Sequence, residues 1–213
     1  MKTIQINEQF KEDWNRVLNH IANLFYEDSV IQFTQDGADM SISFKHHIDS
    51  NYTITTHATL EVDGETYTSD YSIGYAKEGT EKEQSIRMKR ALSHVMLDVL
   101  EQYSGMTQQW GILTGVRPTK LYHKLRKEGK TPEEIFEILK TDYRLSDAKI
   151  NLLKEIVARQ LLVIPDLDEL GKEISIYIGV PFCPTMCAYC TFPAYAIQSN
   201  RKAGRVEKFI DGL

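Results

Sequence analysis

Apolar residues near the start of the chain recur at helical spacing. They lie at Phe10, Trp14, Val17, Leu18, Ile21, Leu24 and Phe25. This spacing predicts a helix with one buried face, because residues three and four apart share a side of a helix. Residues 2–6 ahead of it favour a short strand, and Asn7 is predicted to cap the helix.

Between residues 29 and 75 the period changes to two. Alternation is clearest from Tyr52 to Val62 and from Tyr67 to Tyr75, and it predicts strands with one buried face. Asp36-Gly37 and Asp63-Gly64 separate alternating runs, and Asp-Gly is a strong hairpin signal. We therefore expect two consecutive hairpins forming an antiparallel sheet.

Helical spacing returns after residue 80. Thr80 and Glu83 make a capping-box pattern ahead of an apolar series that predicts a helix of about 23 residues. A second helix is expected over residues 118–128, a third from Thr131-Pro132, and a fourth capped by Ser146.

The pattern changes again at Pro165, where an acidic segment indicates a linker. Beyond it, Ile174–Val180 is a continuous apolar run, which predicts a buried strand of the kind that opens a parallel sheet. A helix is expected from about Lys202. We predict an α+β N-terminal domain over residues 1–165, followed over 174–213 by the first strand and loop of a (β/α) barrel. One strand and one helix cannot close a barrel, so we expect an N-terminal piece of a longer protein.

Composition narrows the function classes. The 213 residues carry a formal net charge of −5, which argues against nucleic acid as a partner. No stretch has the length of a signal peptide's apolar region or of a membrane span. We therefore expect a cytoplasmic protein with no membrane association.

All three cysteines, Cys183, Cys187 and Cys190, fall within eight residues directly after the predicted strand. Thiolates ligate both zinc and iron–sulfur clusters. A structural zinc site takes four protein ligands, whereas three thiolates suit a 4Fe-4S cluster with one open iron. The spacing favours the cluster, and zinc with a ligand from elsewhere or plain structural cysteines are the alternatives.

The arrangement C-x3-C-x-aromatic-C, with Tyr189 at the aromatic position, resembles the signature of the radical S-adenosylmethionine (SAM) superfamily. The surrounding Y-I-x-x-P-F-C is similar to the oxygen-independent coproporphyrinogen III oxidase subfamily, which usually has His where this chain has Gly179. That departure, together with WGILTGVRPTK at residues 110–120, resembles the N-terminal portion of the HemZ-type branch, the coproporphyrinogen dehydrogenases.

The resemblance implies that the cysteines hold a 4Fe-4S cluster and that Tyr177 and Tyr189 contact SAM. Core packing is the alternative for both tyrosines. The expected fold of residues 174–213 becomes the start of a radical-SAM barrel. The expected activity is an oxidoreductase of heme biosynthesis that decarboxylates the propionates of coproporphyrinogen III to vinyls, giving protoporphyrinogen IX. It would need an electron donor and an electron acceptor that the sequence does not identify, and this segment alone is expected to be inactive.

A basic segment at residues 115–130 contrasts with the acidic chain. Coproporphyrinogen carries carboxylates that arginine pairs well with, so Arg117, between Gly115 and Pro118, is a candidate for contact with substrate or across a domain interface. A solvated helix face with salt bridges is the favoured interpretation for the rest of the segment. A heme-binding or heme-delivery protein, or a non-catalytic metal-binding module, remains an alternative function.

Overall fold

The computed structural model describes residues 2–8, 10, 12–33, 37–74, 80–114, 117–169, 174, 176–192 and 194–213. The chain divides into two compact units, residues 1–165 and 166–213, which we describe separately.

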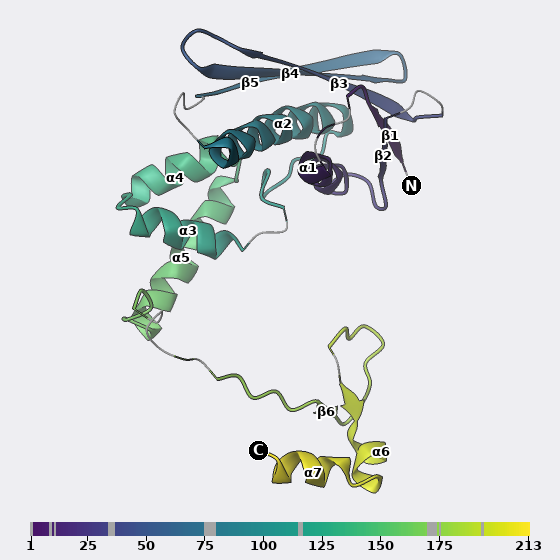
Figure 1. Ribbon diagram of the computed structural model, residues 1–213, viewed down its shortest axis with the longest axis vertical. Helices are drawn as coiled ribbons and strands as arrows, with labels where there is room; N and C mark the ends of the chain where they lie inside the picture. The colour runs from purple at the N-terminus through teal and green to yellow at the C-terminus, as the bar shows by residue number, and fades with distance from the viewer. Residues whose placement is uncertain are drawn as a thin grey trace. The chain divides into compact units, whose positions relative to one another are not determined.

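A five-stranded sheet forms one layer of the first unit (Figure 1). Its strands are β1 (Thr3–Ile6), β2 (Val30–Gln32), β3 (Met40–Ile48), β4 (Thr53–Val62) and β5 (Glu65–Gly74). They lie in the order β2-β1-β3-β4-β5. The expected α+β class is thus observed, but the sheet is mixed rather than antiparallel, because β1 runs parallel to both β2 and β3.

The two long hairpins are formed by β3, β4 and β5. The predicted turn at Asp63-Gly64 is confirmed, with φ of 52° and 81° at its two residues, the left-handed backbone that a two-residue hairpin turn requires. The β3–β4 turn lies instead at residues 49–52, where an Asp49 carboxylate oxygen accepts from the amides of Asn51 and Thr53 at 2.8 Å each.

The predicted hairpin at Asp36-Gly37 is wrong, although Asp36 itself lies outside the described residues. Strands β2 and β3 do not pair with each other, because β1 lies between them. Ile4 and Ile6 of β1 are fully buried, so burial of this short strand outweighs the local turn signal.

The predicted helix cap at Asn7 is also wrong. Its side-chain oxygen accepts from the amide of Phe44 at 3.0 Å, and its own amide donates to the carbonyl of Ile42 at 3.2 Å. Asn7 therefore extends the pairing of β1 with β3, and helix α1 begins later, spanning Glu12–Ala22.

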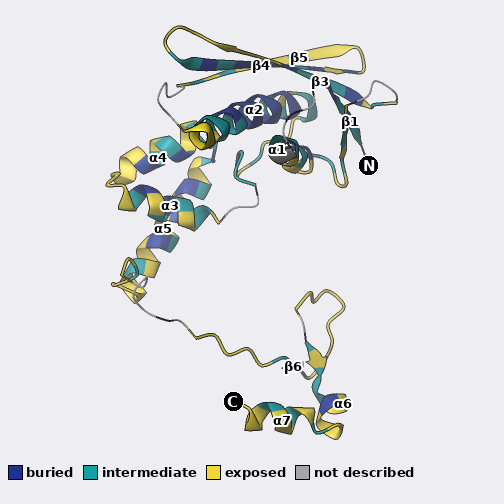
Figure 2. Cartoon of the chain, in the orientation of Figure 1, coloured by how far each residue is buried: buried dark blue, intermediate teal, exposed yellow. Residues whose placement is uncertain are grey.

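Helices α1 and α2 (Glu81–Ser104) cover one face of the sheet (Figure 1). The predicted capping box of Thr80 and Glu83 is confirmed, and the 24-residue helix ends at Gly105 in the left-handed conformation. The interior residues of α2 are buried (Figure 2). They are Met88, Ala91, Leu92, Ser93, His94, Val95, Met96, Leu97, Val99 and Leu100.

Three further helices build a second apolar core in the same unit: α3 (Pro118–Lys127), α4 (Pro132–Thr141) and α5 (Asp147–Val163). Their predicted starts are confirmed, because Thr131 caps α4 in a capping box and Ser146 caps α5. Buried side chains from all three helices, and one from the segment between α4 and α5, meet in this core. They are Tyr122, Leu125, Ile135, Leu139, Leu145, Ile150, Leu153 and Val157.

Arg144 and Gly111 fix the path of the chain between the two cores. One terminal nitrogen of Arg144 lies 2.9 Å from Asp98 and 2.8 Å from Glu101, both on α2. Gly111 has φ of 52°, and a β-carbon there would lie 2.1 Å from the carbonyl oxygen of Tyr143. Glycine is therefore required at this crossing on grounds of both conformation and space.

His94 on α2 is the buried group at this junction. Its ring stacks on Tyr71 at 3.8 Å, and its Nε2–H donates to the carbonyl of Asp142 at 2.8 Å. Arg90 binds the Asp142 carboxylate at 2.8 Å and donates to the Tyr143 hydroxyl at 2.9 Å. Burial lowers the pKa of His94 from 6.5 to about 4, so the ring is neutral near pH 7.

The described residues of the second unit form two short strands and two short helices. Strand β6 (Phe182–Cys183) pairs parallel with β7 (Tyr195–Ala196), and α6 (Ile197–Lys202) and α7 (Arg205–Asp211) follow. The predicted helix near Lys202 corresponds to α7, whereas α6 was not predicted. The described helices include none with the length and apolar character to cross a membrane.

The predicted buried strand Ile174–Val180 is wrong for this structure. Its described residues have no strand structure, and Ile174, Ile176, Ile178 and Val180 are 63–90% exposed. An apolar strand is buried only when neighbouring strands and helices cover both of its faces, and the described residues supply no such cover.

The side-chain hydroxyl of Thr56 on β4 is fully buried and has no hydrogen-bond partner among the described residues. We expect Thr56→Val to raise the free energy of unfolding by about 1 kcal/mol, because it removes an unsatisfied polar group at nearly constant shape. Thr56→Ser, which keeps the hydroxyl and removes the methyl, should lower it. Urea unfolding measures both, and destabilisation by Thr56→Val would show that the hydroxyl has a partner.

Stability should depend on the His94 ring between pH 6.5 and 4. Because its pKa is lowered in the folded chain, the unfolded chain takes up the proton at a higher pH as the pH falls. The free energy by which the neutral His94 ring stabilises the fold is therefore fully present above about pH 6.5 and is lost as the pH falls to about 4. The stability difference between wild type and His94→Gln should shrink by about 3 kcal/mol across this range. Parallel stability curves for the two proteins would contradict a buried neutral ring.

Candidate metal centre

Pairing of β6 with β7 closes the cysteine loop at its base. Phe182 lies opposite Tyr195, and Cys183 opposite Ala196. The Phe182 ring packs edge-on against Phe209 of α7 at 5.6 Å and lies 6.4 Å from the Tyr195 ring. The sequence analysis did not predict these contacts of the Phe182 ring. The aromatic residues on both sides of the cysteine triplet were the signal that could have indicated them.

The three cysteines differ in their surroundings. Cys183 is half-buried in β6, whereas Cys187 and Cys190 are exposed, and all three are free thiols. The amide of Cys190 donates to the carbonyl of Cys187 at 3.0 Å, which closes a turn. The described residues contain no cluster of three or more His, Cys, Asp or Glu in a metal-binding arrangement, so the described thiols are not gathered around one point.

The predicted SAM contacts, Tyr177 and Tyr189, are 94% and 88% exposed. Tyr189 occupies the turn between Cys187 and Cys190. The Tyr177 ring lies over Gly179, where an added β-carbon would come within 3.2 Å of it. Neither ring is packed in a core in this structure, so the core-packing alternative finds no support here.

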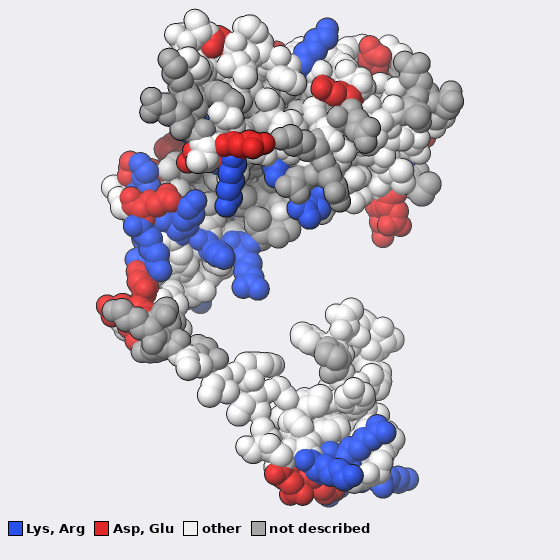
Figure 3. All heavy atoms as spheres, viewed as in Figure 1, with Lys and Arg blue, Asp and Glu red and all other residues white. Residues whose placement is uncertain are grey.

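Residues 174–200 contain no Asp, Glu, Lys or Arg. In Figure 3 the described atoms of this stretch are white. Charged side chains of the second unit precede it at Asp166, Asp168 and Glu169 and follow it on α6 and α7. Exposed apolar side chains of this number are unusual on a soluble surface and mark an interaction or ligand site.

Arg117 lies at the start of α3, in extended backbone just before Pro118. Its guanidinium is exposed and has no hydrogen bond or ion pair to the described residues, while Gly115 lies outside them. Elsewhere in the basic segment, Lys124 pairs with Glu128 at 3.7 Å and Lys130 with Glu134 at 3.2 Å. The expected salt-bridged helix face is therefore present, and it leaves Arg117 out.

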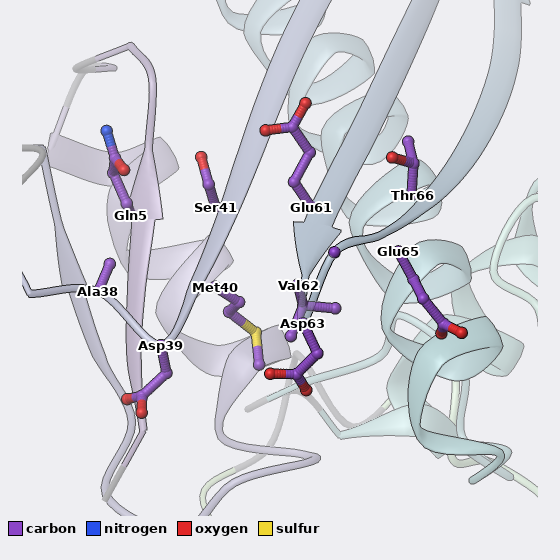
Figure 4. A pocket seen from close by; sticks show the side chains of 11 residues that line it. Gln5, Ala38, Asp39, Met40, Ser41, Glu61, Val62, Asp63, Glu65 and Thr66 are labelled. Carbon is purple, nitrogen blue, oxygen red and sulfur yellow. The ribbon is translucent and has the colours of Figure 1, made fainter.

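A cavity of about 440 Å³ lies at one end of the sheet of the first unit (Figure 4). Four carboxylates, Asp39, Glu61, Asp63 and Glu65, are among its lining residues. Asp39 accepts from the amide of Thr3 at 2.6 Å, so it already has a structural partner. A concentration of negative charge would repel a polycarboxylate, and this cavity is not a candidate porphyrinogen site.

Comparison with known proteins bears on the cysteine loop. No family model matches the chain. The chain is 46% identical over 201 residues to the oxygen-independent coproporphyrinogen-III oxidase-like protein HemZ of Bacillus subtilis (strain 168). The match covers 93% of this chain and 39% of that relative, so the chain spans about two fifths of the relative's length. The resemblance to the HemZ-type branch is confirmed.

Exposure of Tyr177 and Tyr189 predicts where proteases cut. Chymotrypsin should cleave after these residues at least about tenfold faster than after Tyr122, which is 5% exposed in the second core. Mass spectrometry of a digestion time course measures the order of cuts. The same digestion tests the predicted domain boundary, because a fragment of about residues 1–165 should survive. Resistance of residues 183–195 to cleavage in the metal-free chain would contradict the predicted exposure of the cysteine loop.

Proposed function

We propose that this chain carries the cofactor-binding loop of a radical SAM oxidoreductase that converts propionate side chains of coproporphyrinogen III to vinyls. The supporting observation is the Cys183, Cys187 and Cys190 triplet, within a chain 46% identical over 201 residues to an oxygen-independent coproporphyrinogen-III oxidase-like protein.

The donor set fits a 4Fe-4S cluster. Thiolate sulfur is the preferred ligand of such clusters, and two of the three thiols are exposed while the third is half-buried. The Cα reach is at most about 14 Å from Cys183 to Cys187 and about 10 Å from Cys187 to Cys190, so the loop can gather them. Once bound, a cluster with an open iron supplies the electron that cleaves SAM.

The aromatic and apolar residues around the triplet support the same proposal. Exposed Tyr177 and Tyr189 offer flat apolar faces to the adenosine portion of SAM. The uncharged run of residues 174–200 would exclude water from a reactive site once covered. We propose that Ile174–Val180 becomes the first strand of a (β/α) barrel in the longer protein.

The reaction sets requirements that the substrate site must meet. Each propionate loses carbon dioxide, one proton and two electrons when it becomes a vinyl group, so an electron acceptor is needed as well as a donor. Four carboxylates on the macrocycle call for cationic partners. Arg117 and Lys120 of the basic segment are exposed and have no side-chain partner among the described residues. We propose that Arg117 binds a propionate, because its guanidinium can pair with a carboxylate through two hydrogen bonds.

Iron content tests the cofactor proposal. Anaerobic reconstitution of the full-length protein should give about four iron and four sulfide per chain. Alanine at Cys183, Cys187 or Cys190 should abolish stable incorporation, because each removes one of three thiolate ligands. Thr191→Ala, in the same loop, should retain the cluster. Full cluster content in the triple alanine variant would refute the proposal.

Turnover of coproporphyrinogen tests the role of Arg117. Arg117→Gln should raise the KM of the reconstituted full-length enzyme about tenfold and change kcat by less than about twofold, since it removes a charge-assisted contact to a non-reacting carboxylate. Arg159→Gln, an exposed arginine of α5, is the matched control and should leave both constants unchanged. Absence of any vinyl product from the reconstituted wild type would favour heme binding or delivery instead.

A further inference from the structure

Two of the three cysteines are the end residues of one tight turn. The amide of Cys190 donates to the carbonyl of Cys187 at 3.0 Å, with Ala188 and Tyr189 at the corners. A four-residue turn of this kind brings its first and last Cα atoms within about 7 Å. Disulfides span Cα separations of about 4.4–6.8 Å, so the backbone already holds Cys187 and Cys190 near bonding separation.

Cys183 is held in a different setting. It is half-buried in β6, opposite Ala196 in the ladder, and the adjoining Phe182 packs against Phe209. The described backbone hydrogen bonds close a turn between Cys187 and Cys190, and none of them closes a turn between Cys183 and either other cysteine. A disulfide that distorts its backbone is strained and more easily reduced.

We infer that in the cluster-free protein Cys187 and Cys190 form a reversible disulfide while Cys183 stays a free thiol. The inference that this disulfide also blocks cluster loading rests on the proposed function, because it withdraws two of the three thiolate ligands. The loop would then act as a redox switch that accepts iron only under reducing conditions.

Exchange with a small-molecule disulfide, RSSR, accomplishes the oxidation. The thiolate of one cysteine attacks a sulfur of RSSR, forming a protein–SR mixed disulfide and releasing RS⁻. The thiolate of the other cysteine attacks the protein sulfur, closing the Cys187–Cys190 bond and releasing a second RS⁻. The two protein thiols lose two protons and two electrons, and RSSR gains them as two thiols.

Alkylation mapping tests the pairing. The iron-free 213-residue chain is equilibrated anaerobically with mixtures of reduced and oxidised glutathione, quenched with acid and treated with N-ethylmaleimide. Trypsin leaves all three cysteines in one peptide, residues 173–201. Tandem mass spectrometry should find the alkyl group on Cys183 in more than about nine tenths of the singly alkylated peptide. Predominant alkylation of Cys187 or Cys190 would overturn the inference.

Single variants separate geometry from mere proximity in sequence. Cys183→Ala should form the disulfide at the same glutathione ratio as wild type, within about twofold. Cys187→Ala leaves Cys183 with Cys190, and Cys190→Ala leaves Cys183 with Cys187. Both variants should need a ratio of oxidised to reduced glutathione about tenfold higher to form a disulfide. Equal ratios for all three variants would show that the turn does not select the pair.

Iron uptake distinguishes this inference from the proposed function. The oxidised chain should take up less than about a tenth of the iron bound by the reduced chain, and dithiothreitol should restore uptake. If the mapping gives Cys187–Cys190 but the reduced chain also rejects iron, the disulfide stands and the cluster proposal fails. If the reduced chain binds iron but the mapping gives another pair, the cluster proposal stands and the switch fails.

Discussion

Burial of helix α2 is the constraint on which the first unit depends. Ten of its residues are buried, and strands β4 and β5 pack on one side of the helix while α1 packs on another. One layer of sheet could not cover so much apolar surface, so α1 and the short strand β1, which lies between β2 and β3, are needed to complete the core. The opposite face of the sheet carries hydroxyl side chains such as Thr55 and Ser72, which bond to each other at 2.8 Å and remain exposed to water.

The second core joins the first through polar groups rather than a shared apolar interface. Arg90, His94 and Arg144 connect α2 to the segment between α4 and α5, and each has partners fixed by side-chain or carbonyl hydrogen bonds. Directional bonds of this kind specify one arrangement of the helices, whereas apolar packing tolerates several. Because His94 is buried and neutral, the stability of this arrangement of helices also depends on pH.

The second unit has the opposite balance of burial. Its apolar and aromatic side chains are largely exposed, and its order depends on a two-residue ladder and a few aromatic contacts. Exposed residues such as Tyr177 and Tyr189 bury almost no apolar surface in the second unit and so do not stabilise it. Aromatic rings and apolar side chains of this kind can pack against a cofactor or a covering scaffold, and this is why the proposed function lies in the loop rather than in the cavity at the sheet end.

Local signals in the sequence determined the helix starts at Thr80, Thr131 and Ser146 and the turn at Asp63-Gly64, because each depends on residues within a few positions of one another. The close spacing of the three cysteines is likewise a property of the sequence alone. The insertion of β1 between β2 and β3, the sheet role of Asn7 and the exposure of Ile174–Val180 depend on partners far away in the chain or on the lack of cover from the described residues. Strand order and burial are long-range properties, so the tertiary structure alone decided them. The same holds for the cysteines: their spacing permits a shared ligand, but only the folded loop places Cys187 and Cys190 in one turn and Cys183 in a ladder.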